Sequence, residues 1–421
     1  MINRTQSILS RRFPALASPD FVLFLAGQFI SVIGTWMQNT AQPYLAYRIS
    51  GRPLDLGLIG FASTLPTLLL ALPAGVLVER WDKRKTVIVF QTIMSVQAFG
   101  LAALTFTGRI QIWHIIVFAL IFGTASAVEI TARQSMLIEL AGREALPSAI
   151  ALQTTVFNIG RVLGPLTASW LLTSTGTEGS VFLANGVSFL FVIGGLFIAR
   201  TRYKVPRQIK INKGLRAEFR EGLVYIRGNT LVATIILMSA LIGFFGFPMV
   251  QQVPALARDV LQTVGDTEAL VAARTSSLYA AQGAGALTAA LMAAYLSSSR
   301  KKGILVTLGQ VAFIFPLIAL AFTTSLSISL FLWVVIGWGT VTQLVTMNTL
   351  IQVIVPNGLR GRVFSMYLWA VQGVAPFGSL LIGWLAQNWG VPLAALTGGL
   401  VSLISIGSLH LIHPGVRHAQ A

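Results

Sequence analysis

The chain has 421 residues, of which 55% are hydrophobic and only 10% charged, and its mean hydropathy is +0.76. This composition excludes a soluble globular protein of this size and indicates a chain that lives in a lipid bilayer. The chain contains no cysteine, which excludes disulfides, thiolate chemistry and Cys-ligated metals, and we expect neither a metal site nor a cofactor.

Apolar runs recur along the whole chain, and a transmembrane helix needs about 20 apolar residues. We therefore predict an all-α membrane protein with twelve transmembrane helices and no sizeable soluble domain. The first run is too long for a cleaved signal peptide and has no small-residue cleavage site, so we expect it to be retained. The predicted spans are residues 21–47, 54–78, 86–107, 110–131, 146–174, 180–200, 229–251, 276–297, 303–323, 326–353, 361–388 and 391–413.

Basic residues test this count, because they accumulate in cytoplasmic loops. With the N-terminus inside, nearly all of the 30 Lys and Arg residues fall in cytoplasmic segments. This predicts that both termini are cytoplasmic, and it explains the net charge of +17 by topology instead of a nucleic-acid partner. The exceptions are Arg48, Arg52, Arg109, Arg258 and Arg274 in outer loops and Arg161 within a span.

Neutral amides occur in several spans, beginning with Gln38, Asn39 and Gln42 beside Trp36 in the first. Amides among aromatic side chains suit a bulky substrate that is polar yet partly apolar. Hydrogen bonds between helices are the alternative for each of them. The other candidates for a substrate cavity are Gln282 in the eighth span, Gln343 and Asn348 in the tenth and Gln372 in the eleventh.

The loop between the second and third spans reads GVLVERWDKRK, residues 75–85, and is densely charged. Topology alone explains a basic cytoplasmic loop. It does not require Gly75 or Glu79, so this loop is predicted to have a further role.

Two ionisable residues stand out within the predicted spans, where charges are costly and usually functional. Glu129 falls in the last turn or so of the fourth span, one turn before Arg133. An ion pair at the rim is one interpretation, and a proton-coupling acid, assisted by Arg133, is the other. Arg161 lies about 22 Å into the fifth span, at 1.5 Å per residue. It suits either an anionic or catecholate-like substrate or structural bonds to neighbouring carbonyls.

A repeat is visible between the fifth and eleventh spans. GRVLGPLTASWLL (160–172) and GVAPFGSLLIGWL (373–385) both place proline beside small residues, followed by tryptophan. Gly160, Gly164 and Pro165 predict close helix packing and a bend. The repeat indicates two six-helix pseudo-repeats, residues 1–200 and 229–421.

The two predicted halves are joined by a basic linker, residues 201–228. Leu215, Phe219, Leu223 and Ile226 recur in it at helical spacing. We expect an amphipathic helix on the anionic cytoplasmic leaflet, tethering the halves.

With these motifs in place, the whole chain resembles the major facilitator superfamily. In that resemblance Gly75, Glu79, Arg80, Lys83 and Arg84 occupy the signature of the loop between spans two and three, with Glu79 for the usual Asp and Asp82 where Gly is usual. The resemblance implies that Glu79 lies near Arg360 and Arg362 at the start of the eleventh span. This would be a latch that is closed when the cavity opens outward.

Residues 131–165 and 355–390 resemble the bacterial exporter branch that includes the enterobactin exporter and the macrolide efflux proteins. This implies outward movement of amphipathic small molecules through a cavity lined by spans one, four, seven and ten. Gly160, Gly164 and Pro165 resemble the fifth-span motif of drug–proton antiporters, but the fourth-span arginine of such proteins is absent. That departure puts a standard proton relay in doubt.

The sequence therefore predicts a secondary active exporter of siderophore-like or drug-like molecules, a monomer in the bacterial inner membrane, with protons as the coupling ion. No phosphate-binding GxxxxGK[ST] loop is present, which disfavours ATP as the energy source. Uptake and export without protons remain alternatives. A membrane enzyme or sensor is the weaker one, because the chain shows no assembled nucleophile, base or metal set.

Overall fold

The computed structural model of the protein describes residues 13–199, 215–263, 265–296 and 301–417, apart from the side chains of residues 71–77, 79, 80, 215–218 and 357. This part of the chain is almost wholly helical and contains no strand. The principal helices are α2 (Pro19–Ser50), α3 (Pro53–Arg80), α4 (Lys83–Phe106), α5 (Ile112–Ala141), α6 (Leu146–Thr175), α7 (Glu178–Ile198), α8 (Leu215–Gly228), α9 (Thr230–Gln251), α11 (Glu268–Tyr295), α12 (Lys302–Ala319), α13 (Leu326–Ile354), α14 (Asn357–Gly373) and α15 (Ala375–Ile412). Short helical turns are η1 (Pro14–Ala17), α10 (Val253–Ala255), the π-helical η2 (Leu256–Val260), η3 (Leu320–Phe322) and η4 (Pro414–Val416).

The long helices fall on the predicted spans, which confirms the all-α membrane fold. Among the described residues, nine helical stretches are long and apolar enough to cross a membrane. One of them, Gly358–Ile412, joins the last two predicted spans, and Gly390 divides it with a φ of +84° that only glycine adopts readily. The α6 and α11 helices are as long as many of the others but are not among these nine stretches.

Three predicted boundaries are wrong. The fourth span continues to Ala141, ten residues beyond the predicted end at 131, because charged residues that were assigned to a loop are paired and the helix ends only at Gly142. The eighth span starts at Glu268, where Thr267 caps the helix, so Arg274 lies inside α11 and not in a loop. The eleventh span is not one helix.

The break in the eleventh span lies at Val374, between α14 and α15. Pro376 lacks a backbone N–H and occupies the first turn of α15, where no intrahelical partner is needed. By contrast, Pro165 lies inside a continuous α6. The two halves of the predicted repeat therefore differ in this local structure.

The chain groups into two compact units. The first comprises Met1–Gln42 and Leu69–Ile209, and the second comprises Pro43–Leu68 and Lys210–Ala421. The α2 and α3 helices thus each contribute to both units, and α2 changes unit at Pro43, a proline inside the helix. The change of unit near residue 209 falls within the predicted linker, whereas residues 43–68 group with the second unit; the six-helix halves stay a prediction.

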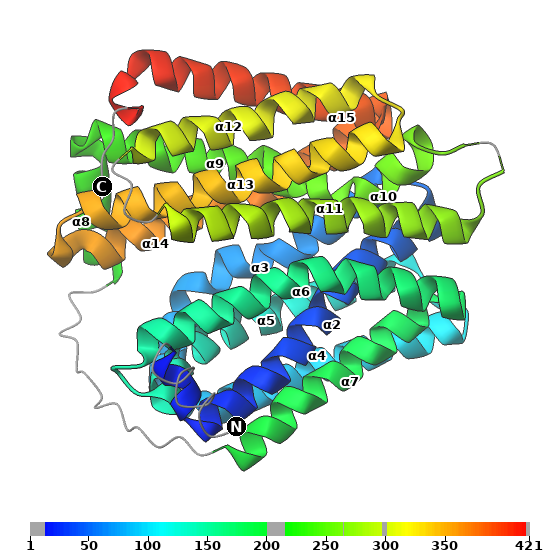
Figure 1. Ribbon diagram of the computed structural model, residues 1–421, viewed down its shortest axis with the longest axis horizontal. Coiled ribbons are helices and arrows are strands. Elements are labelled where there is room, and N and C mark those ends of the chain that lie inside the picture. Colours follow the sequence, from blue (N-terminus) through cyan, green and yellow to red (C-terminus); the bar gives the residue numbers. More distant parts are fainter. Residues whose placement is uncertain (1–12, 200–214, 264, 297–300, 418–421) are drawn as a thin grey trace, which may run out of the picture. The chain divides into compact units, whose positions relative to one another are not determined.

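In the first unit, α4 packs against both α5 and α7 (Figure 1). One end of this unit has an apolar core built by α2, α4, α5 and α7, with Phe21 and Phe24 fully buried. In the second unit, α13 packs against α11 and α12, and α15 packs against α9. Trp333 is the largest fully buried side chain of this unit.

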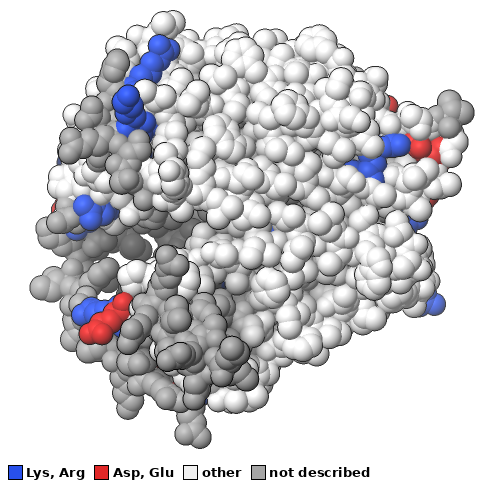
Figure 2. Space-filling view, viewed as in Figure 1, with Lys and Arg blue, Asp and Glu red and all other residues white. Residues whose placement is uncertain are grey.

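Charged side chains on the face shown in Figure 2 gather near the ends of the helices, and an uncharged surface lies between them. Many large apolar side chains are exposed on the described helices, among them Leu69, Trp170, Phe197 and Leu291. Such a surface is suited to lipid and not to water. It agrees with a multi-pass membrane protein.

Candidate functional site

The fifth predicted span, α6, lies unusually close to α2 in the first unit. A Cβ added at Gly160 would lie 2.5 Å from Cγ1 of Val32, and one at Gly164 would lie 2.3 Å from Cβ of Trp36. Only glycine allows this approach, because such distances are shorter than any van der Waals contact. In this structure the glycine motif therefore serves helix packing, and it places Trp36 against the middle of α6.

Arg161 lies at this contact, halfway along the 30-residue α6. Its guanidinium carbon is 5.3 Å from the centroid of the Trp36 ring, a cation–π arrangement. The Trp36 ring also meets Phe157 edge-on, at 5.5 Å between centroids. Among the described residues, Arg161 has no hydrogen bond or ion pair, and its Nε is buried without a partner.

The amides predicted on α2 separate into two groups. Gln38 is buried and its amide hydrogen-bonds with Gln42, Gln97 and Asn185 at 2.7–3.2 Å, which ties α2 to α4 and α7. Gln42 also donates to the carbonyl oxygen of Ile115. These contacts belong to helix packing. Asn39, by contrast, is exposed, and it lies three residues after Trp36, on the same side of α2.

The predicted amides of the second unit also differ in exposure. Gln282 and Gln343 are buried, and neither polar atom of the Gln343 amide has a hydrogen-bond partner in the described part of the chain. Asn348 is half-buried and accepts a hydrogen bond from the exposed Gln352. Gln372 is exposed. Asn348 and Gln372 are therefore the more exposed two of these four amides.

Glu129 is buried within the first unit and is paired. Its carboxylate accepts hydrogen bonds from Nε of Arg133 at 3.1 and 3.3 Å and from the amide of Gln91 at 2.9 Å. Because α5 continues to Ala141, Glu129 lies about three turns before the helix ends, not in its last turn as predicted. The predicted ion pair is present, but it lies deeper in the helix than the predicted rim position.

Two basic residues at the start of α4, Lys83 and Arg84, have partners inside the first unit. Lys83 forms an ion pair with Glu139 of α5, and Arg84 donates to the carbonyl oxygen of Phe197. Asp82 caps α4 by accepting from the backbone N–H of Lys85.

The proposed latch itself is only partly covered by the structure. The side chains of Gly75, Glu79 and Arg80 lie outside the described residues. Of the predicted partners on α14, Arg360 is exposed, and Arg362 forms an ion pair with Glu221 of α8. The linker helix α8 therefore packs on α14, where Gly222 also meets Met366.

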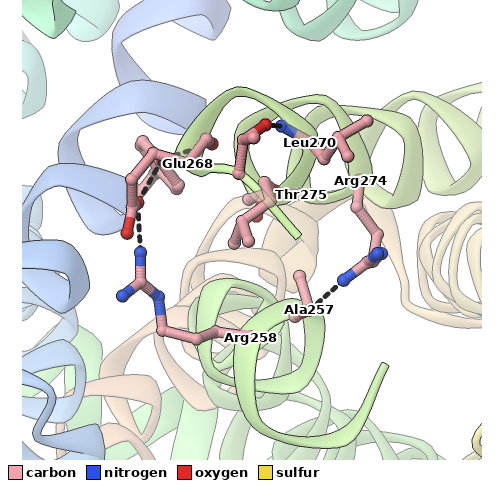
Figure 3. Close-up of polar contacts among 9 residues, drawn as sticks. Ala257, Arg258, Glu268, Leu270, Arg274 and Thr275 are labelled. Atoms are coloured by element: carbon pink, nitrogen blue, oxygen red, sulfur yellow. Dashed lines mark hydrogen bonds and ion pairs between the residues drawn. The ribbon is translucent and has the colours of Figure 1, made fainter. Parts of the chain in front are cut away.

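A polar cluster that sequence reasoning missed lies in the second unit, where the last turns of α2 meet η2 and the start of α11. The buried Tyr44 donates to the backbone oxygen and the Oε2 of Glu268, at 3.0 and 3.1 Å. The buried Tyr47, three residues later, donates to Oδ2 of Asp259. Arg258 forms an ion pair with Glu268 (Figure 3), so both tyrosines are held by one charged turn. We name Tyr44, Tyr47, Arg258, Asp259 and Glu268 the tyrosine clamp.

Arg274 fixes the same turn from the other side. It donates to the carbonyl oxygen of Ala257 at 3.0 Å (Figure 3) and to Oδ2 of Asp266 at 2.6 Å. The backbone N–H of Thr263, which donates to the same carboxyl, and Arg274 hold the pKa of Asp266 below its ordinary value. The turn that carries the tyrosine clamp is thus rigidly braced.

The first half of α3 makes further contacts within the second unit. A Cβ at Gly57 would lie 2.5 Å from the carbonyl oxygen of Ser379, and Gly383 meets the same glycine. The amide of Gln252 donates to the carbonyl oxygen of Pro53 at 3.2 Å. The tyrosine clamp is therefore one part of a close-packed end of this unit.

Comparisons with known proteins agree over nearly the whole chain. The sequence profile of the family described as "Transmembrane secretion effector" matches residues 11–419. The chain is 23% identical to the multidrug efflux pump Tap of Mycolicibacterium fortuitum, over 94% of this chain and 96% of Tap. It is 24% identical to the enterobactin exporter EntS of Salmonella choleraesuis, over 94% of this chain and 92% of EntS.

Among solved structures, the nucleoside transporter NupG resembles this chain with a TM-score of 0.71. The two share 12% sequence identity, over 93% of this chain and 98% of NupG. At this identity the likeness concerns the fold.

Proposed function

Because the chain belongs to the major facilitator superfamily, in the family of transmembrane secretion effectors, we propose that it exports amphipathic small molecules by alternating access, with protons as the coupling ion. The family and its structural neighbours are transporters and not enzymes. Similarity to Tap and EntS supports outward transport of drug-like or siderophore-like molecules. The placement of the basic loops supports a bacterial inner-membrane protein whose two termini both lie in the cytoplasm.

The observation that carries the proposal is the division of α2 and α3 between the two compact units. Their ends near the α2–α3 connection are fastened to the second unit by the tyrosine clamp and by the Gly57–Ser379 contact. In the proposed orientation this end is extracytoplasmic. These contacts lie within the second unit, and we propose that they act as an outer gate that loosens when the carrier opens outward.

Two titratable or charged residues receive roles in this proposal. Glu129 is proposed as the proton-coupling acid, since it is a buried carboxylate within a predicted span and is paired with Arg133. Glu79 is the cytoplasmic latch, on the strength of the loop signature. Glu79→Ala should abolish transport while expression and thermal stability stay unchanged; normal transport by this variant would reject the latch.

The proposal is tested with purified full-length protein, a monomer by our expectation, in liposomes with an imposed pH gradient. Fluorescent drug-like amphiphiles and iron-free siderophores are supplied either inside or outside the liposomes, so that export and uptake are distinguished. We expect movement coupled to proton flow in the opposite direction, collapsing when a protonophore is added. If no candidate moves under any gradient, the transport proposal fails; if movement ignores the protonophore, only the proton coupling fails.

A further inference from the structure

Within the described part of the chain, Arg161 is a cation without a counter-ion, halfway along α6, which is a predicted membrane span. Such a charge is costly in lipid and is retained where a cavity or a partner faces it. The described carboxylates of the first unit that lie on neighbouring α5 are already engaged, Glu129 by Arg133 and Glu139 by Lys83. The anion that would balance Arg161 is therefore absent from the described part of the protein.

From this arrangement we infer that Arg161, Trp36 and Phe157 form a binding site for the aromatic ring and the single negative charge of a small organic anion. The inference rests on the proposed transport function and names the chemical class of its substrate. Its parts are a charge, an aromatic surface and a neutral amide, considered in turn below.

The guanidinium sets the charge of the ligand. One of its faces is covered by the Trp36 ring, whereas the N–H groups along its edge have no acceptor among the described residues. An edge with several parallel N–H donors matches a carboxylate in a two-point hydrogen bond. Arg161 is the only basic residue in the α6 sequence, so the single charge that α6 supplies is matched by a monoanion.

The aromatic rings set the shape of the ligand. Phe157 lies one helical turn before Arg161 and is 48% exposed although it contacts Trp36. An exposed ring beside a cation offers an edge or face against which a second aromatic ring packs at 4.5–7 Å, the usual range for aromatic pairs. The exposed Asn39 lies three residues after Trp36, on the same side of α2, and its amide adds a neutral hydrogen-bond donor and acceptor for a further polar group.

Two glycines of α6 make the close contact between Trp36 and Arg161 possible. Gly160 and Gly164 allow α2 to approach until Trp36 covers Arg161, so the small-residue motif positions the site without touching a ligand. A wider spacing between these helices would separate the ring from the cation.

The test uses three ligands that share a naphthalene ring and differ in charge, namely 1-naphthoate, 1-naphthamide and 1-naphthylmethylammonium. Their binding to the full-length protein in zwitterionic lipid nanodiscs is measured by equilibrium dialysis. We expect the affinity for naphthoate to exceed that for naphthamide by about 10- to 100-fold, the usual strength of hydrogen bonds to a charged group, and the ammonium to bind most weakly.

Variants assign this preference to the site. Arg161→Gln should abolish the preference for naphthoate, Arg161→Lys should lose part of it because lysine lacks the planar donor edge, and Trp36→Phe should reduce affinity several-fold. The matched control is Arg109→Gln, which removes the same charge from an exposed loop and should change nothing. Thermal unfolding of each variant is recorded, and Arg161→Lys keeps the test decisive if Arg161→Gln does not fold.

Equal affinity for naphthoate and naphthamide, or an unchanged preference in Arg161→Lys and Arg161→Gln, would overturn the inference. These results are separable from failure of the transport proposal. Gradient-driven movement of amphiphiles without naphthoate preference would refute the site alone, and naphthoate binding that depends on Arg161 without any flux would refute transport alone.

Discussion

The close contact between α2 and α6 gives the most quantitative prediction, on Gly164→Ala. The added Cβ would lie 2.3 Å from Cβ of Trp36 and 2.9 and 3.0 Å from backbone atoms of Trp36 and Met37. Two of these three neighbours are backbone, so no side chain can rotate away and the helices have to separate by about 1 Å in a close-packed interior.

The expected size of the effect follows from two opposing contributions. Overpacking of this kind costs about 1–3 kcal/mol, and replacing glycine by alanine inside a helix returns about 0.5–1 kcal/mol. Gly164→Ala should therefore lower the free energy of unfolding by about 0–2.5 kcal/mol. It should also weaken naphthoate binding, because the wider spacing moves Trp36 away from Arg161.

The matched control is Gly194→Ala in α7, where nothing lies within 4 Å of an added Cβ. Without overpacking, this variant should gain about 0.5–1 kcal/mol. Both variants are unfolded with SDS in mixed micelles and followed by far-UV circular dichroism. A Gly164→Ala protein as stable as Gly194→Ala would refute the reasoning, since it would mean that α2 and α6 are not in contact.

Three further predictions concern the charged groups and the clamp. Glu129→Gln should remove pH-driven export while substrate exchange without a gradient persists; intact pH-driven export would exclude Glu129 from proton coupling. Removing both clamp hydroxyls, Tyr44→Phe with Tyr47→Phe, should speed maleimide labelling of Leu56→Cys at least about 5-fold, because each hydrogen bond lost is worth about 1 kcal/mol. The background has no cysteine to interfere, and an unchanged rate would show that the clamp does not hold this end closed. The lowered pKa of Asp266 means that its ionised form stabilises the folded state, so the stability advantage of wild type over Asp266→Asn should be present above pH 3.8 and shrink as the pH falls below it; an advantage independent of pH would contradict this assignment.

Hydropathy alone located the helices, because the bilayer forces every spanning segment to be apolar and internally hydrogen-bonded. It also placed Arg161 correctly in the middle of α6, since depth along a helix follows from counting residues. The same counting failed for Glu129. Arg133 and Glu139 lie beyond the predicted end of the span at residue 131, yet each is paired with another charged residue and lies within α5.

The sequence does not predict which side of a helix faces its neighbours and which side is exposed. Gln38 and Asn39 are neighbours of the same kind, yet one is buried among α4 and α7 and the other is exposed, because the rotation of α2 depends on contacts made far along the chain. The tyrosine clamp was missed since its partners are more than 200 residues apart. Two tyrosines one turn apart at the end of a span, together with a later loop containing Arg258 and Asp259, were the available signal.

The shared membership of α2 has a thermodynamic consequence. Trp36 at the ligand site and Tyr44 at the clamp lie about 12 Å apart on one helix, at 1.5 Å per residue. Suppose that a ligand binds more tightly when the clamp is formed than when it is broken. Binding of that ligand must then shift the clamp equilibrium by the same factor by which clamp formation raises the ligand's affinity. Pro43 lies between Trp36 and Tyr44, where the helix lacks one backbone hydrogen bond. The stiffness of α2 at this proline determines how strongly ligand binding and clamp formation are coupled.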